Sequence, residues 1–281
     1  MLAGSACLVL AAAVYGLAVW TPTGQRFEDA VLQAADGSPH RTGALSLLSP
    51  WTMVAALALV ASAGLRRGGR PAACAAAAIA VGPVLTARLL RRLLVRPALF
   101  DPGPRHRHIL DAVDHQQNQS FPSGHTAAAL GVMCALVLVT PHRFRPVVFA
   151  LTSAAVGVGA LSVTAGMHRP SDTVGSGCLV LAWLCAALVL LGRRSALLRV
   201  GRGPGHLLVA GFLAAGASAG AVLGSIAGAR TMIQVRAAPD PQLLVSPDAL
   251  VAGQALALSG GLLVLLCLFV LLGGLDLRRP R

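Results

Sequence analysis

Long apolar runs alternate with short polar segments along the whole chain of 281 residues. Most runs approach the roughly 20 residues that an α-helix needs to cross a bilayer, so the polar segments between them are connecting loops. The pattern therefore predicts an all-α fold, a polytopic membrane helical bundle. The eight expected spans are residues 2–20, 43–65, 71–94, 126–139, 147–166, 173–191, 207–227 and 255–273.

Composition supports the membrane assignment, because 56% of the residues are apolar and only 12% are charged. Soluble domains carry about 25% charged residues. The first run lacks a basic start and a clear cleavage site, so we expect a retained span rather than a removed signal peptide. All six cysteines lie in apolar runs, which argues against disulfides and a metal site, and we expect no cofactor.

The net charge of +13 comes from arginines clustered between apolar runs. Such clusters are typical of membrane loops and not of a nucleic-acid-binding face. If both termini are cytoplasmic, the short inner segments contain Asp276 as their only acid, and the positive-inside rule favours this orientation in the cell membrane. The arginines of these inner segments are Arg66, Arg67, Arg70, Arg143, Arg145, Arg193, Arg194, Arg199, Arg202, Arg278, Arg279 and Arg281.

The fourth run opens with Pro122, Ser123, Gly124 and His125, where a polar segment meets the membrane. Proline and serine are typical of a helix start, and glycine lets the backbone approach a ligand. Free N–H groups at such a start favour an anion such as phosphate. We expect Ser123 and Gly124 to supply these N–H groups and His125 to transfer a proton. The alternative is a simple helix cap beside an interfacial histidine.

A second histidine, His168, precedes the sixth run at a tight connection. Pro170 is well placed as the first residue of the next helix, with Arg169 near its cap and Asp172 in its first turn. A carboxylate on one imidazole nitrogen fixes the tautomer and leaves the other nitrogen free to attack phosphorus. An aspartate cap with an interfacial histidine is again the alternative.

Four arginines, Arg88, Arg91, Arg92 and Arg96, lie at the end of the third run, on the same expected outer face. Guanidinium groups bind phosphate oxygens and offset charge in a transition state. Arginines at the end of a span also contact lipid phosphates, so part of this group has an alternative role.

Together these residues resemble the type-2 phosphatidic acid phosphatase superfamily, which includes lipid phosphate phosphatases, undecaprenyl pyrophosphate phosphatases and vanadium haloperoxidases. Its Pro-Ser-Gly-His motif is complete at residues 122–125, and the His and Asp of its third motif are His168 and Asp172. Its first motif is recognisable as Arg91 or Arg92 leading to Arg96-Pro97. The resemblance covers residues 45–192, a six-span core; residues 1–44 form an N-terminal span and outer loop, and residues 193–281 form extra C-terminal spans and a basic tail.

Two departures from the family pattern bear on the site. The first-motif lysine is an arginine here and the spacing is shorter, so Arg88, Arg91 and Arg92 all remain candidates for that position. Leu161-Ser162 stands where the third motif has Ser-Arg, so the arginine of that motif is missing. Arg169 is a possible replacement that would approach the phosphate from a different direction.

The resemblance implies metal-independent hydrolysis of a phosphate ester or pyrophosphate on a lipid, through a phosphohistidine on His168. The phosphate would be bound by Arg91, Arg96 and Arg169, and the lipid would enter from the outer leaflet. Loop 97–121 would act as a lid or headgroup selector. Its histidines, His106, His108 and His115, are expected at the surface and not in catalysis.

Two other functions stay open at this point. A phosphotransferase would use the same residues and pass the phosphoryl group to an acceptor other than water. A non-enzymatic membrane protein would keep the fold and have lost activity with the missing arginine. The sequence does not decide which lipid is bound or the oligomeric state.

Overall fold

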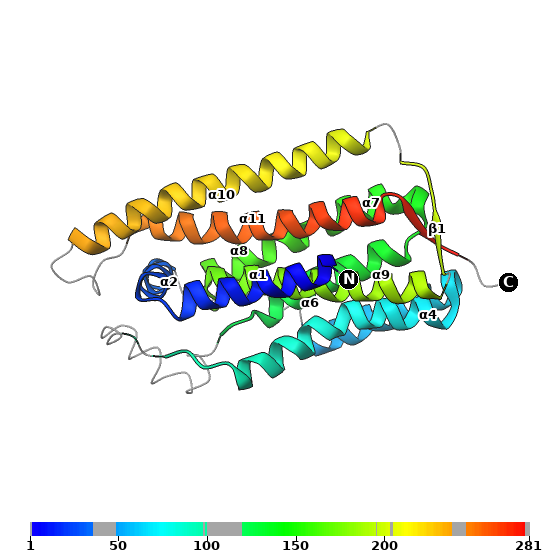
Figure 1. The fold of residues 1–281 in the computed structure, drawn as a ribbon, viewed down its shortest axis with the longest axis horizontal. Coiled ribbons are helices and arrows are strands. Elements are labelled where there is room, and N and C mark those ends of the chain that lie inside the picture. The colour runs from blue at the N-terminus through cyan, green and yellow to red at the C-terminus, as the bar shows by residue number, and fades with distance from the viewer. Residues whose placement is uncertain are drawn as a thin grey trace.

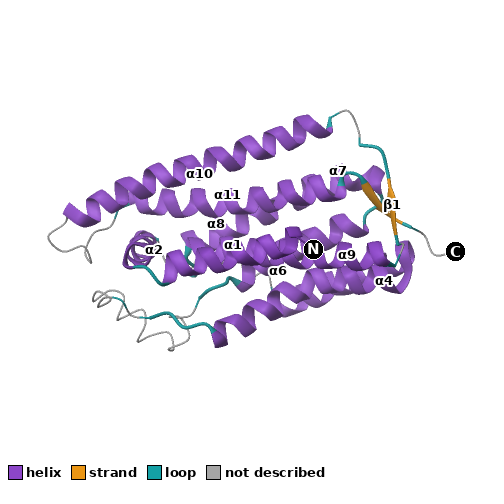
Figure 2. Ribbon diagram, viewed as in Figure 1, coloured by secondary structure: helices purple, strands orange, loops and turns teal. Residues whose placement is uncertain are grey.

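The computed structural model describes residues 2–35, 49–97, 99, 120–194, 196–202, 205–237 and 246–278. Nearly all of these residues are helical, and six of the described helical segments are long and apolar enough to cross a membrane (Figures 1 and 2). The expected all-α membrane bundle is therefore confirmed. The elements are α1 (Leu2–Val19), α2 (Pro22–Ala34), α4 (Pro50–Leu93), α6 (Gly124–Val139), η3 (His142–Phe144), α7 (Arg145–Thr152), η4 (Ser153–Val156), α8 (Gly157–Thr164), α9 (Pro170–Arg193), β1 (Leu197–Arg199), α10 (His206–Ala237), α11 (Pro247–Leu272) and β2 (Leu275–Leu277).

The long element α4 contains two of the expected spans. Gly69 interrupts it with φ 70°, a left-handed conformation that glycine adopts without steric cost. The chain folds back at this point, since a Cβ on Gly64 would lie only 2.7 Å from the Cα of Ala73. Nine residues of straight helix would separate these positions by about 13 Å. The halves of α4 are thus two antiparallel helices joined at the arginine-rich turn that the sequence pattern placed between spans.

The fifth expected span is not one continuous α-helix. Its apolar stretch is divided into α7, the 3₁₀ turn η4 and α8. The last two spans are longer than expected: α10 continues to Ala237 and α11 begins at Pro247, where the sequence suggested a polar loop between residues 228 and 254. Helix α10 packs mainly against α11 and lies at one edge of the bundle in Figure 1.

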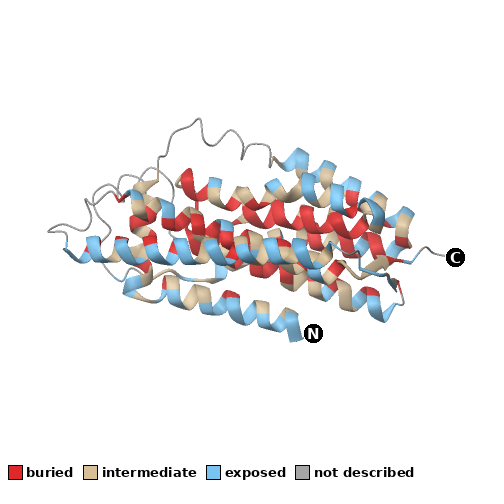
Figure 3. Cartoon of the chain, turned by 90° about the horizontal axis from the view of Figure 1, so that it is seen from above, coloured by how far each residue is buried: buried red, intermediate tan, exposed pale blue. Residues whose placement is uncertain are grey.

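The main core lies between the second half of α4, α6, α9 and α11. Buried residues concentrate along these elements, while many residues of α1 and α10 are exposed (Figure 3). The exposed residues of α1 and α10 include Leu8, Leu17, Leu207 and Phe212. Exposed leucines and phenylalanines on outer helices suit contact with lipid. The largest buried side chains of this core are Ile79, Leu130, Met133, Leu138, Leu184, Leu191, Leu268 and Leu272.

The two short strands β1 and β2 pair antiparallel at the end of the bundle near the C-terminus (Figure 2). Asp276 of β2 binds Arg67 beside the α4 turn at 2.9 Å and Arg145 of α7 at 3.4 Å. Arg145 also donates to the Leu272 carbonyl at 2.7 Å. These contacts tie the α4 turn, α7 and the chain after α11 together at one end.

Helix α2 corrects the expectation of a polar loop at residues 21–41. The Thr21 side chain accepts a hydrogen bond from Gly24 N–H, and Pro22 is the first helical residue, a favourable helix start. The apolar side chains of α2 pack in a second cluster against α8, α10 and α11, with Val31 almost fully buried. This docking brings the polar residues of α2 to the end of the bundle opposite the β-strands (Figure 1).

Candidate active site

Three chain segments that are distant in sequence meet at the end of the bundle where α6 and α9 begin. They are the end of α4, the start of α6 and the connection between α8 and α9. Arg91 of α4 lies against Gly124, and His125 lies beside His168. The structure therefore brings the three motifs together at one end of the bundle.

The Asp172 carboxylate faces the His168 imidazole at the start of α9. Asp172 is fully buried, and its Oδ2 lies 3.4 Å from His168 Nδ1 and accepts the Arg169 N–H at 2.9 Å. Pro170 is the first residue of α9 and Arg169 its N-cap, as the sequence indicated. The carboxylate thus faces one imidazole nitrogen and leaves Nε2 directed elsewhere. The tautomer with a proton on Nδ1 is the one this geometry favours.

His125 occupies the other side of that imidazole. Its Nδ1 lies 3.5 Å from His168 Nε2, and the ring centroids are 5.7 Å apart with an angle of 65° between the ring planes. If His168 carries its proton on Nδ1, its Nε2 accepts and His125 donates. Asp172, His168 and His125 are therefore arranged in series, so that a proton could pass between the buried carboxylate and the cavity that His125 lines.

A cavity of about 480 Å³ begins at His125 and runs between the two halves of α4 and α6. Its polar end has Arg88, Arg91, Gly124 and His125, and the rest of its lining is apolar. Arg92, one helical step from Arg91, is exposed and does not line it. Of the three first-motif candidates, Arg88 and Arg91 therefore face the cavity. The apolar lining residues are Pro50, Met53, Val54, Leu57, Val81, Val84, Leu85 and Ala128.

Arg91 comes very close to the α6 backbone because Gly124 has no side chain. A Cβ at position 124 would stand 3.1 Å from Arg91 Nη2. Gly124 also lies in the first turn of α6, where an N–H has no intrahelical partner. The Arg91 guanidinium and the N–H at the start of α6 could therefore both donate hydrogen bonds to a bound anion.

Ser123 caps α6, as the sequence indicated, but its N–H has a partner other than the expected phosphate. Its N–H donates to the Asp172 carbonyl at 3.0 Å, and its hydroxyl accepts the Thr126 N–H at 3.3 Å. Ser176 adds a hydroxyl that lies 2.7 Å from the carbonyl oxygens of both Ser123 and Asp172. Ser123 therefore caps α6 and joins it to α9, and we do not include it among the phosphate ligands proposed below.

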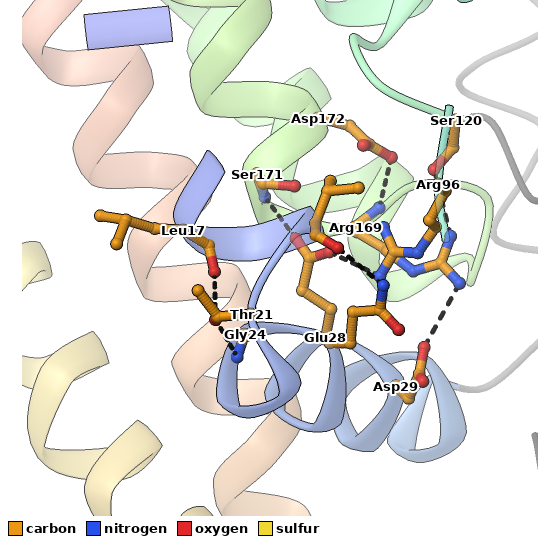
Figure 4. Close-up of polar contacts among 12 residues, drawn as sticks. Leu17, Thr21, Gly24, Glu28, Asp29, Arg96, Ser120, Arg169, Ser171 and Asp172 are labelled. Atoms are coloured by element: carbon orange, nitrogen blue, oxygen red, sulfur yellow. Dashed lines mark hydrogen bonds and ion pairs between the residues drawn. The ribbon is translucent and has the colours of Figure 1, made fainter. Parts of the chain in front are cut away.

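Arg96 and Arg169 do not line the cavity; both are paired with α2. Arg96 lies 3.0 Å from Glu28, and Arg169 lies 3.3 Å from Asp29 and 3.2 Å from the Ser120 hydroxyl (Figure 4). The side chains of both arginines are more than nine-tenths buried. Arg169 thus points to α2 and does not stand in for the missing third-motif arginine in this structure.

The position of that missing arginine is occupied by Ser162, which is fully buried. Its hydroxyl donates to the Gly159 carbonyl at 2.8 Å, and its own carbonyl accepts the N–H groups of Met167 and His168. Ser162 therefore shapes the turn that presents His168 and contributes no charge.

The sequence interpretation missed α2 as part of the site. The Thr21-Pro22 start and the apolar spacing of Phe27, Ala30, Val31 and Ala34 were the signals for a docked helix. Loop residues 100–119, including His106, His108 and His115, lie outside the described residues, so their expected roles stay predictions. Among the described residues, no group of three or more His, Cys, Asp and Glu side chains could hold a metal ion.

The fold and this site define a membrane-spanning helical protein with a paired-histidine centre beside a cavity that has a basic end and apolar walls. The family model described as the PAP2 superfamily matches residues 71–196, which supports membership of the chain in that superfamily. This match supports a phosphoric ester hydrolase at the level of the family. Searches of curated proteins and of solved structures found no match.

Proposed function

We propose that the chain is an integral-membrane lipid phosphatase that hydrolyses a lipid phosphate ester or pyrophosphate through a phosphohistidine on His168. The observation that carries this proposal is the Asp172–His168–His125 chain at the mouth of a cavity with a basic end and apolar walls. A phosphate at the basic end would leave the lipid tail along the walls. A soluble phosphate ester would gain nothing from such walls.

In the first step, the Nε2 lone pair of His168 attacks phosphorus, and the bond from phosphorus to the leaving oxygen breaks. His125 protonates that oxygen, which departs as the lipid alcohol or lipid phosphate. Asp172 stabilises the imidazolium that develops when the N–P bond forms. In the second step, His125 takes a proton from water, and the water oxygen attacks phosphorus. The bond between phosphorus and His168 Nε2 breaks, its electron pair returns to the ring, and inorganic phosphate leaves.

Arg91 is the proposed phosphate ligand, with Arg88 next to it and the Gly124 N–H opposite. These three groups would hold the phosphoryl oxygens and offset the charge that spreads over them in the transition state. The proposed reaction needs no metal ion, because cationic side chains supply this stabilisation.

We also propose that the site faces the outer leaflet and that both termini are cytoplasmic. The opposite end of the bundle has the α4 turn, the start of α7 and both strands, with Arg67, Arg145 and Arg199 among its residues. An excess of arginine in short loops favours the cytoplasmic side.

The test is phosphate release from a polyprenyl pyrophosphate and from phosphatidic acid, by purified protein in detergent with EDTA. We expect release by wild type, loss in His168→Ala, and retention in His142→Ala, a matched control at the other end of the bundle. No release from either lipid by well-folded wild type would contradict the proposal. Release that depends on an added acceptor alcohol would favour the phosphotransferase, and a His168→Ala variant with unchanged biochemistry would favour the non-enzymatic protein.

A further inference from the structure

We propose that Glu28, on a helix outside the matched segment, is a positioning residue for the reaction at His168. It would act through Arg96 and through the first turn of α9. This inference rests on the proposed phosphatase function, because its readout is the rate of the chemical step.

Glu28 contacts both sides of the site at once (Figure 4). One carboxylate oxygen lies 3.0 Å from Arg96 Nη2, on the segment that follows α4. The other accepts the Ser171 N–H, in the first turn of α9, at 3.3 Å. One side chain thus joins the end of α4 to the start of α9, the two segments that present Arg91 and His168.

The position of Glu28 next to Asp172 adds an electrostatic link. Burial raises the pKa of the Glu28 carboxyl above its usual range; Arg96 opposes this shift, the Asp172 carboxylate adds to it, and Arg169 opposes it. Asp172 accepts the Arg169 N–H in the same turn of α9 where Ser171 donates to Glu28. The two carboxylates therefore share one helix start, where the helix dipole favours negative charge.

Helix docking alone gives no reason to bury this carboxylate. The apolar side of α2 already packs through Ala30 and Val31, whereas a buried carboxylate costs several kcal/mol in desolvation that its partners must offset. Glu28 is 2% exposed and Arg96 7%. A buried pair that spans two catalytic segments fixes their relative positions, and misplacement by about 1 Å can lower a catalytic rate on the order of 100-fold.

Loss of Glu28 should therefore affect the chemical step more than binding, because the lipid tail is held by apolar walls that Glu28 does not touch. We expect Glu28→Gln to lower kcat about 10- to 100-fold and to change KM less than about threefold. Glu28→Asp keeps the charge and should restore part of kcat. Thr23→Ala, at an exposed position of the same helix, is the matched control and should behave as wild type.

The experiment is steady-state phosphate release with the lipid that wild type prefers, on the full chain in detergent, normalised to monodisperse folded protein. The set includes Arg96→Gln and the double variant with Glu28→Gln, because residues that act as one unit give non-additive effects. We expect the double variant to match the slower single variant. A kcat that falls in Glu28→Gln, with KM nearly constant and partial rescue by Asp, would support the inference.

Other outcomes would overturn it. Wild-type kcat in folded Glu28→Gln, or multiplicative losses in the double variant, would show that Glu28 has no positioning role. If Glu28→Gln fails to fold, the test uses Glu28→Asp and the double variant of Glu28→Gln with Arg96→Gln. A wild-type kcat in both of these proteins would reject the inference. No release by wild type would reject the proposed function itself and this inference with it, whereas an active wild type with an unaffected Glu28→Gln rejects only the inference.

Discussion

His168 has its two ring nitrogens in opposite environments. Nδ1 faces the buried Asp172 carboxylate at 3.4 Å, and Nε2 faces His125 at 3.5 Å. A carboxylate on one side makes the other nitrogen a better nucleophile and stabilises the cation that forms on attack. The proposed chemistry of this protein therefore depends on which group each ring nitrogen meets.

Replacing Asp172 by asparagine tests this dependence. The amide keeps the size of the side chain but removes the charge that stabilises the imidazolium. We expect kcat to fall about 10²- to 10⁴-fold. The measurement is a single-turnover rate of phosphate release, with Ser171→Ala beside it as the control. A loss smaller than about threefold would show that the carboxylate only caps α9.

Gly124 offers a change that separates stability from activity. Alanine favours a helix over glycine by up to about 1 kcal/mol, and no positive φ is recorded at this position. Its Cβ would, however, stand 3.1 Å from Arg91 Nη2 and displace that guanidinium by a few tenths of an ångström. We expect Gly124→Ala to unfold at the same temperature or higher and to lose about threefold or more in kcat/KM. Equal activity in both proteins would argue against Arg91 as the phosphate ligand.

Helix α9 is the element on which the site is built. Its first turn carries Asp172, and its second turn contacts the segment that leads into α6, where Phe121 covers Gly175. Tyr15 of α1 packs on the other side of Phe121, with ring centroids 5.3 Å apart. The entry to α6, and with it His125, is thus held by a contact that requires a glycine on α9.

The Gly175→Ala variant should break this contact. A Cβ there would lie 2.4 Å from Phe121 Cζ, so the ring must move and the start of α6 with it. We expect a loss of about 1–3 kcal/mol in unfolding free energy and lower activity per folded molecule. Gly192→Ala on the same helix is the control, since a Cβ at that position meets nothing within 4 Å. Similar behaviour of the two variants in thermal unfolding would contradict the argument.

Helix α2 gives the protein a pH-dependent stability. Burial raises the pKa of Glu28 above the value of about 4.3 that a glutamate has in an unfolded chain. The folded state therefore holds more protons than the unfolded state between these two values. The stabilisation linked to Glu28 is fully present below the unfolded pKa and is lost as pH rises through the folded pKa.

This linkage is measurable by thermal unfolding in detergent between pH 4 and pH 8, comparing wild type with Glu28→Gln. The unfolding temperature of wild type minus that of the variant should fall as pH rises and then level off above the raised pKa. Parallel curves for the two proteins would show that Glu28 does not titrate differently on folding.

At the scale of the whole molecule, the bundle separates two polar ends. One end has the paired histidines and α2, and the other has Asp276 with Arg67 and Arg145. Buried apolar layers of α4, α6, α9 and α11 lie between them. This arrangement predicts that charge changes at the strand end affect stability without affecting the reaction.

Asp276→Asn tests that separation. The variant removes the carboxylate shared by two partly buried arginines, although Arg145 keeps its bonds to backbone carbonyls. We expect about 1–2 kcal/mol lower stability, with kcat and KM per folded molecule unchanged. A changed kcat in folded protein would show that the two ends are coupled through the bundle.

The sequence by itself determined the class of fold and the local geometry around His168. Apolar runs of about 20 residues predict membrane helices, because a helix of that length crosses the bilayer and satisfies its backbone hydrogen bonds within one segment. The start of α9 at Pro170 and the reach of Asp172 to His168 also followed from sequence, since both are set within one helical turn. Local rules suffice where every partner is a near neighbour in the chain.

Only the tertiary structure decided which arginines line the cavity of the proposed phosphate site. Arg91 and Arg96 are both basic and five residues apart, yet one lines the cavity and the other is buried against Glu28. Helical rotation and the docking of α2 separate them, and both depend on packing between segments distant in sequence. The N–H of Ser123 is a second example. Its place at a helix start predicts a phosphate partner, but in the folded chain it donates to the Asp172 carbonyl of α9.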